Sequence, residues 1–265
     1  MTWPEGGARV AASAVGSEAI LVVVGYEGPS IVTPTADADP VTHARSDFRL
    51  GHWVIPDERA DVYMYRAAWV PDGEGRDWEE AADIAVDWVL SEAHGRGAPP
   101  LVIANGKNSV TDVGRLGQLG RQYGVATPRS RDLTRGRGAV LAYVPTLEAL
   151  EMAVRVARGS SLCVVEGFAQ PMAGWAVAVG AEDLTLPAVG TAAPLNSVLV
   201  EALERLVSYG NNGWGDQFGK QQAQRVLADL SREWRNPEFI AGYVIGKGRS
   251  ARGAKNLQAI IRKLS

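Results

Sequence analysis

The sequence predicts an α/β protein with a mainly parallel, Rossmann-like sheet and flanking helices, followed by a small all-helical C-terminal subdomain. Short runs of Val, Ile and Leu alternate with amphipathic helical stripes as far as residue 193. Repeated strand-helix-strand units are typical of a parallel sheet covered by helices. After Pro194 only helical stripes remain. We therefore expect a sheet domain at residues 1–193 and a helical subdomain at residues 194–265.

Strands are expected where apolar, often β-branched residues run together and a turn or polar residue follows. These segments are residues 19–25, 61–70, 101–105, 139–144 and 162–165. Runs this short and this apolar are typical of strands that are buried on both faces. The stretch at residues 30–47 is rich in Pro, Thr and Asp, and we expect it to form a loop.

Helices are expected between these strands. Asp77 is a suitable N-cap for a helix whose apolar stripe ends just before Gly95, and Thr146 is a suitable N-cap for a second helix. Two less regular helices are expected at residues 111–123 and 171–179.

The C-terminal region is expected to consist of four helices. Their apolar stripes lie within residues 195–207, 223–234, 236–244 and 250–264, and a Gly/Asn-rich break separates the first two at residues 210–215. Asn236 and Ser250 are suitable N-caps for the last two.

Composition limits the classes of protein to consider. Of the 265 residues, 46% are apolar, which is enough to bury a core, and no apolar run is long enough to span a bilayer. The N-terminus has no basic start before an apolar stretch, so we expect a cytoplasmic protein with no membrane partner. Cys163 is the single cysteine, which excludes an intrachain disulfide and a cysteine-based metal cluster.

The three histidines His43, His52 and His94 show no ligand spacing, so no metal site is predicted. The cofactor, if any, is unknown from the sequence.

Charge is distributed unevenly along the chain. Residues 1–100 hold 17 acids and 7 bases, whereas residues 101–265 hold 13 acids and 20 bases. Clustered Lys and Arg attract phosphates, so the second part could bind a polyanion such as DNA or RNA. The alternative is that the two oppositely charged parts pack against each other. The overall pI of 5.7 is far below that of a dedicated nucleic-acid-binding domain.

The most basic segment is the C-terminal end. Between residues 243 and 265 there are six basic residues and no acidic residue. We expect these side chains to contact nucleic-acid phosphates; they are Lys247, Arg249, Arg252, Lys255, Arg262 and Lys263. The alternative is a solvated helix face, because cations are favoured near a helix C-terminus.

Polar residues that follow predicted strands are the candidates for ligand binding. In a doubly wound sheet, ligands bind beyond the carboxyl ends of the strands. Asn105, Lys107 and Asn108 follow one strand, and Thr146 follows another, so we expect these four residues to contact an anionic ligand. An ordinary polar turn is the alternative, because the chain contains neither a G-x-G-x-x-G nor a G-x-x-x-x-G-K-[ST] pattern.

The segment Val164-Val165-Glu166-Gly167-Phe168 resembles the first motif of Toprim domains, in which a glutamate ends a hydrophobic strand and acts with magnesium on phosphodiesters. The resemblance covers residues 162–191 and implies a catalytic role for Glu166. The D-x-D pair that this family carries after a later strand is missing here. Because two-metal chemistry needs several converging carboxylates, a structural or ligand-contacting role for Glu166 stands beside the catalytic one.

Three hypotheses for function follow. The first is a nucleic-acid-associated protein in which a scaffold or degenerate catalytic core carries the basic helical end. The second is an enzyme or sensor that binds a nucleotide-like small molecule at the strand ends. The third is an interaction module that self-associates or binds a protein partner in a larger assembly, motivated by eight tryptophans, several of them in predicted loops.

Overall fold

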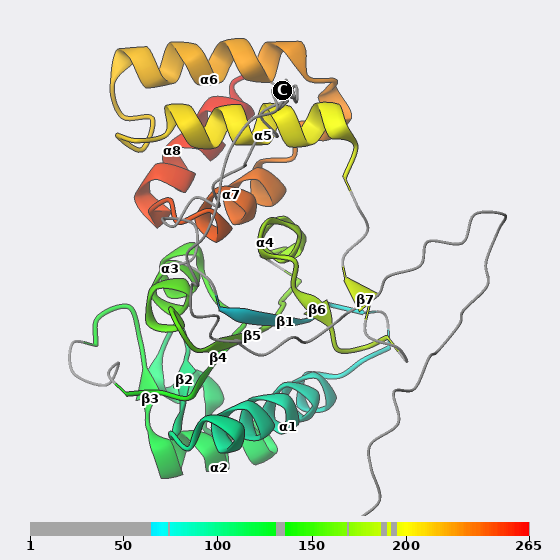
Figure 1. Ribbon diagram of the computed structural model, residues 1–265, viewed down its shortest axis with the longest axis vertical. Coiled ribbons are helices and arrows are strands. Elements are labelled where there is room, and N and C mark those ends of the chain that lie inside the picture. The colour runs from blue at the N-terminus through cyan, green and yellow to red at the C-terminus, as the bar shows by residue number, and fades with distance from the viewer. Residues whose placement is uncertain are drawn as a thin grey trace, which may run out of the picture. The chain divides into compact units, whose positions relative to one another are not determined.

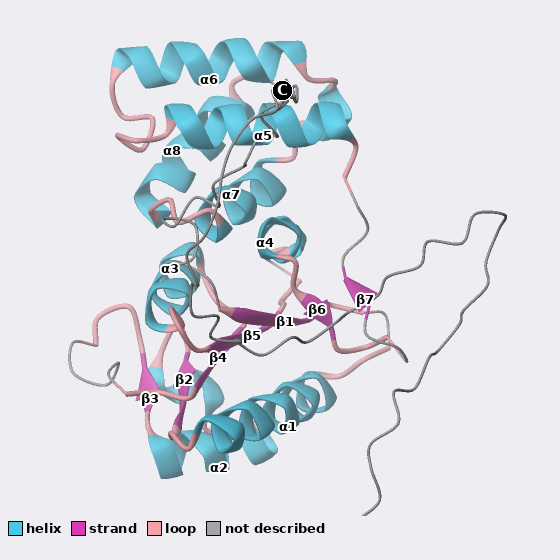
Figure 2. Cartoon of the chain, in the orientation of Figure 1, coloured by secondary structure: helices cyan, strands magenta, loops and turns pink. Residues whose placement is uncertain are grey.

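The computed structural model describes residues 65–264, apart from 74, 131–135, 169, 187–189 and 192–194. The strand expected at residues 19–25 and the loop expected at residues 30–47 lie outside the described residues, as do His43 and His52. The described chain folds into a sheet with helices on both faces, followed by a group of helices (Figures 1 and 2).

The sheet has seven strands in the order β3-β2-β4-β5-β1-β6-β7, and the first six are parallel. Their bounds are β1 Arg66–Val70, β2 Pro100–Ile103, β3 Val125–Ala126, β4 Ala139–Tyr143, β5 Ser161–Val165, β6 Glu182–Asp183 and β7 Gly190–Thr191. The predicted α/β fold with a mainly parallel sheet is confirmed. Three two-residue strands, β3, β6 and β7, were not expected.

Side chains along each central strand alternate between two cores. In β2, Leu101 and Ile103 belong to one hydrophobic cluster, whereas Val102 between them belongs to the other. All three are fully buried. Because both faces are covered, the strands need apolar residues at every position, which explains why they read as continuous apolar runs in the sequence.

One face of the sheet is covered by α1 (Trp78–Arg96) and α2 (Gly114–Tyr123). Asp77 caps α1 as predicted, since its carboxylate accepts a hydrogen bond of 2.7 Å from the Glu80 amide. The helix continues past Gly95 and ends at Gly97, whose φ of +62° supplies the left-handed cap. A short 3₁₀ helix, Lys107–Val110, precedes α2, which therefore begins later than expected.

The other face is covered by α3 (Leu147–Val156) and α4 (Ala173–Val179), over which the C-terminal helices lie. These are α5 Ser197–Tyr209, α6 Gln217–Asp229, α7 Pro237–Gly246 and α8 Ala251–Arg262, with a 3₁₀ turn at Arg232–Trp234. Thr146, Asn236 and Ser250 cap α3, α7 and α8 as predicted. None of the helices in the described part of the chain has the length and apolarity needed to cross a membrane.

Close packing of α7 against α4 joins the C-terminal helices to the sheet. A Cβ added at Gly174 of α4 would lie 1.8 Å from the Phe239 carbonyl oxygen, and one added at Gly242 of α7 would lie 3.0 Å from the Trp175 amide nitrogen. Glycine therefore allows the two backbones to touch. The fully buried Trp175 donates its indole hydrogen to the Tyr65 hydroxyl at 3.1 Å.

One hydrophobic cluster runs without a break from the α3/α4 face of the sheet into α5, α6, α7 and α8. Residues of β4 such as Val140 and residues of α8 such as Leu257 belong to the same cluster. The change from strands to helices near residue 194 is as expected. The division into two domains at that point stays a prediction.

We expect Gly174→Ala to lower the free energy of unfolding by about 3 kcal/mol, the upper part of the range for overpacking, because the new methyl group would overlap a backbone carbonyl that cannot rotate away. Gly95→Ala is the matched control: Gly95 is exposed within α1, and a methyl group added there would meet no other atom, so the change should stabilise the helix by about 0.5–1 kcal/mol. Denaturant unfolding of both variants measures the difference. Equal stability of the two variants would contradict the α4–α7 contact.

Candidate functional site

The sheet changes winding direction between β2 and β4. After β2 the chain continues to α2 on one face, whereas after the neighbouring β4 it continues to α3 on the other face. The two loops therefore diverge at the carboxyl edge and leave a crevice, the usual place for a ligand in such a sheet.

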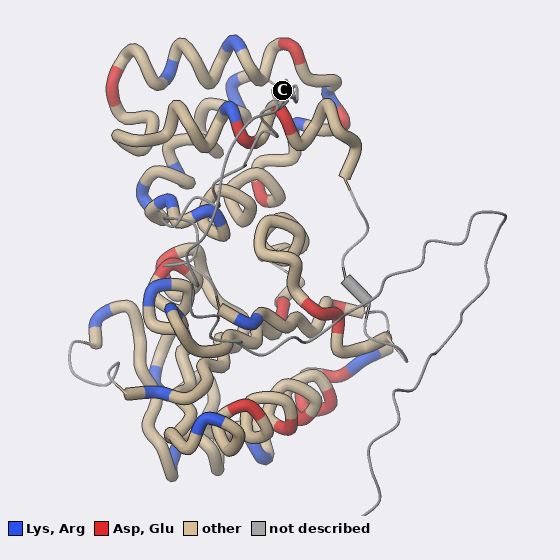
Figure 3. The backbone as a smooth tube through the Cα atoms, viewed as in Figure 1, with Lys and Arg blue, Asp and Glu red and all other residues tan. Residues whose placement is uncertain are grey.

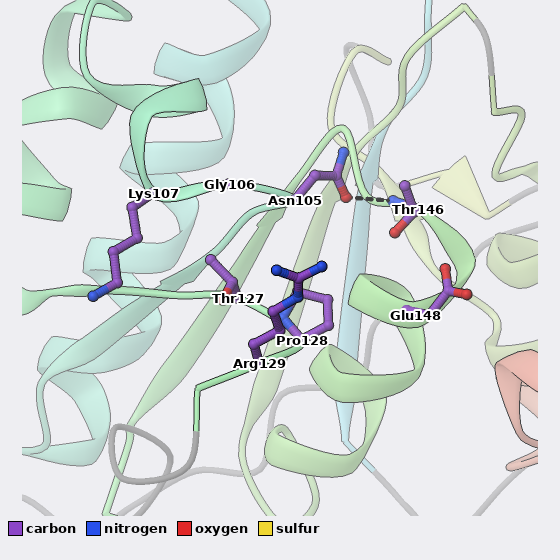
Figure 4. Close-up of a pocket in the computed structure, with 8 residues that line it drawn as sticks. All are labelled: Asn105, Gly106, Lys107, Thr127, Pro128, Arg129, Thr146 and Glu148. Carbon is purple, nitrogen blue, oxygen red and sulfur yellow. Dashed lines mark hydrogen bonds between the residues drawn. The ribbon is translucent and has the colours of Figure 1, made fainter.

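A pocket of about 550 Å³ occupies this place (Figure 4). We call it the carboxyl-edge pocket. It is lined by Asn105, Gly106, Lys107, Thr127, Pro128, Arg129, Thr146 and Glu148. Three of the four predicted ligand residues, Asn105, Lys107 and Thr146, are thus brought together. Asn108 lies exposed in the 3₁₀ helix and does not line the pocket.

Asn105 joins the two loops. Its Nδ2 donates to the Val144 carbonyl oxygen at 2.8 Å, and its Oδ1 accepts from the Thr146 amide at 2.8 Å. One side chain after β2 thereby fixes the position of the chain after β4. Since both polar groups of Asn105 are already bonded, its main contribution is to hold the shape of the pocket.

The backbone at Val144 is strained. Its φ is +44°, a conformation that a β-branched residue rarely adopts and that costs about 1–3 kcal/mol. Packing holds it there: the Val144 amide donates to the Val165 carbonyl oxygen at 3.0 Å, and Gly167 leaves space for the Val144 side chain. A Cβ at Gly167 would lie 2.3 Å from Val144 Cγ1. Strain of this kind gathers at functional sites.

Two cations line the pocket. Lys107 and Arg129 are exposed, and neither forms an ion pair or a side-chain hydrogen bond with another described residue. Figure 4 shows the Arg129 guanidinium between Asn105 and the start of α3, with Lys107 at the opposite end of the pocket from Glu148. Arg129 was not among the predicted ligand residues. It follows the strand Val125–Ala126, which is too short to be recognised as a strand from the sequence.

The wall formed by α3 carries a neutralised acid. Glu148, in the first turn of α3, forms an ion pair with Lys255 of α8. The hydrogen bond from Lys255 holds the pKa of Glu148 below its ordinary value. One turn on, the Glu151 carboxylate accepts a hydrogen bond of 3.0 Å from the amide of Ala251, the first residue of α8. The pocket wall is therefore tied directly to the C-terminal helices.

Glu166 lies outside the pocket, where β5 ends beside β1. Its carboxylate accepts hydrogen bonds from the Trp69 indole at 2.9 Å and the Met172 amide at 3.1 Å, so it links β1 to the start of α4. Burial raises the pKa of Glu166 above its ordinary value, against the opposing effect of these two bonds. Among the residues that the structure describes, no group of three His, Cys, Asp or Glu side chains is placed to hold a metal ion.

Half of the predicted phosphate-contacting residues form ion pairs with acids from other elements. Lys247 pairs with Glu204 at 2.8 Å, Arg262 pairs with Glu238 at 2.8 Å, and Lys255 pairs with Glu148 as described above. The tube in Figure 3 shows acids beside bases along these helices.

The remaining three differ in exposure. Arg252 and Lys263 are exposed, and within the described residues they have no ion-pair partner. Arg249 is partly buried, and its Nε atom has no hydrogen-bond partner among the described residues. Arg115, a basic residue of α2, pairs with Asp87 on the opposite face of the sheet from α8, so it adds nothing to the basic end.

The raised pKa of Glu166 predicts how stability depends on pH. Because the folded form holds the Glu166 proton more tightly than the unfolded chain, this residue should make the free energy of unfolding fall as pH rises from about 4.5 through the raised pKa. Denaturant midpoints at several pH values, compared between wild type and Glu166→Gln, measure this contribution. The variant should lack this pH-dependent contribution to stability. Identical pH profiles for the two proteins would contradict a raised pKa of Glu166.

Comparisons of this chain with protein-family models, with curated proteins and with solved structures found no match.

Proposed function

We propose that the protein binds a small, phosphate-bearing, nucleotide-like ligand in the carboxyl-edge pocket. The observation that carries this proposal is the presence of two exposed cations, Lys107 and Arg129, at the place where the winding of the sheet leaves a crevice. Because neither has a carboxylate partner among the described residues, both are available to an anion.

The groups around the pocket suit a phosphate. The guanidinium of Arg129 offers a planar pair of donors that matches phosphate oxygens, and Lys107 adds a flexible ammonium group. The Thr146 hydroxyl oxygen accepts a hydrogen bond from the Ala149 amide at 3.4 Å, and the hydroxyl donates to the Glu148 carboxylate, so Thr146 holds the shape of this side of the pocket. The charge of Glu148 is balanced by Lys255, so this wall repels an anion only weakly.

We expect Lys107→Ala and Arg129→Ala each to weaken binding of inorganic pyrophosphate about 10- to 100-fold, the effect of losing a hydrogen bond to a charged group. Titration calorimetry at low ionic strength on the full chain measures this. Lys220→Ala is the matched control, because it removes an exposed cation on α6 outside the pocket lining. An equal loss in the control, or no loss in either pocket variant, would contradict the proposed site.

A second candidate function is association with nucleic acid through α8. The exposed side of this helix presents Arg252, Lys255 and Arg262, three basic side chains at helical spacing. Two of them are paired with acids, but ion pairs on the surface contribute only about 0–1 kcal/mol. Nucleic-acid phosphates can therefore replace the carboxylates at little cost. Lys247, Arg249 and Lys263 flank the helix and would extend this surface.

If α8 contacts nucleic acid, Arg252→Ala should weaken binding of labelled DNA or RNA and reduce the slope of log K against log salt by about one unit. Lys220→Ala, which removes an exposed lysine from α6, is the control and should leave the slope unchanged. Fluorescence anisotropy over a range of salt concentrations gives both values. Absence of binding even at low salt would exclude this function.

A further inference from the structure

Two exposed aromatic side chains lie where strands end at the carboxyl edge. Trp78, the first residue of α1, is 42% exposed, and Phe168, in the turn after β5, is 79% exposed. Water contact at so much of an aromatic surface is unfavourable unless something covers it. Neither side chain has a part in the carboxyl-edge pocket as its lining residues define it.

Gly167 connects these aromatic residues to the pocket. A Cβ added at Gly167 would lie 3.6 Å from Cη2 of Trp78 and 2.3 Å from Cγ1 of Val144, so both side chains face this glycine. Phe168 is the next residue. Val144 in turn accepts the hydrogen bond from Asn105, which lines the pocket. A chain of contacts therefore links Trp78 through Gly167 and Val144 to Asn105.

A second contact joins the start of α1 to the start of α2. A Cβ added at Gly114 would lie 2.2 Å from the Glu79 carboxylate, so the residue after Trp78 touches the first residue of α2. The segment that leads into α2 begins at Lys107. The start of α1 therefore contacts the helix that follows Lys107 and its 3₁₀ helix.

We propose that Trp78 and Phe168 form an aromatic subsite that stacks the base of a nucleotide whose phosphates bind Lys107 and Arg129. The subsite rests on the proposed function, because the pocket must first hold the phosphates. Indole and phenyl rings present flat π-faces that stack on any base. Gly167 is buried, and its missing side chain leaves the space in which Val144 and Trp78 approach each other. The strained Val144 backbone lies beside it.

Binding of two probe types by the full chain tests the subsite. Titration calorimetry compares inorganic triphosphate with the four common ribonucleoside triphosphates. We expect wild type to bind at least one nucleotide about tenfold more tightly than inorganic triphosphate, the gain of one stacked base. Trp78→Ala or Phe168→Ala should remove this gain without changing the affinity for inorganic triphosphate.

Two further variants separate stacking from structural damage. Trp78→Phe keeps an aromatic ring and should retain most of the gain, and Phe218→Ala, which removes an exposed aromatic ring from α6, should change neither affinity. Inorganic triphosphate bound as tightly as every nucleotide would overturn the subsite and leave the pocket intact. Failure of both probes to bind would overturn the proposed function and the subsite together. A nucleotide preference that survives loss of both rings would place the base elsewhere and overturn the subsite alone.

Discussion

The side chain of Asn105 holds together the two loops that leave neighbouring strands towards opposite faces of the sheet. At this point of divergence, the Asn105 side chain supplies the donor for the Val144 carbonyl oxygen and the acceptor for the Thr146 amide. A side-chain amide is neutral and offers both. The crevice between the loops, the strained backbone at Val144 and the first turn of α3 are all connected by this pair of bonds.

The same region connects the sheet to the C-terminal helices. Glu148 and Glu151 lie one turn apart on α3, and both bind the N-terminal half of α8. Acids that bind the start of a helix are favoured by its dipole as well as by its unpaired amide groups. The pocket wall and α8, the helix with the most basic exposed face, are therefore bonded directly to each other.

The elements that could be predicted from the sequence are those whose pattern lies within a few neighbouring residues. The apolar runs of β2, β4 and β5 and the caps Asp77, Thr146 and Ser250 depend on neighbouring residues, and these predictions are confirmed. Three of the pocket residues followed from the rule that ligands bind at strand ends. Arg129 did not, because β3 has two residues and owes its existence to pairing with β2.

The charge of the basic C-terminal end could not be predicted from the sequence for the same reason. Its bases are close together in the sequence, but their partners Glu148, Glu204 and Glu238 come from three different helices. No pattern along the chain reveals that pairing, since it arises only when the helices pack. Charge counted along a sequence therefore overstates the charge that a surface presents.

The strand order has a consequence for how the chain folds. β1 comes first among the described strands, yet its partners are β5 and β6, so Arg66 has to wait for Ser161 before their parallel pairing can form. The units β2-α2-β3 and β4-α3-β5 can assemble from nearby residues, whereas β1 pairs only with strands that come much later in the chain. A high average sequence separation of contacts slows folding. A nascent chain would thus carry an unpaired, apolar β1 until β5 has left the ribosome, a period in which a chaperone would have the most to protect.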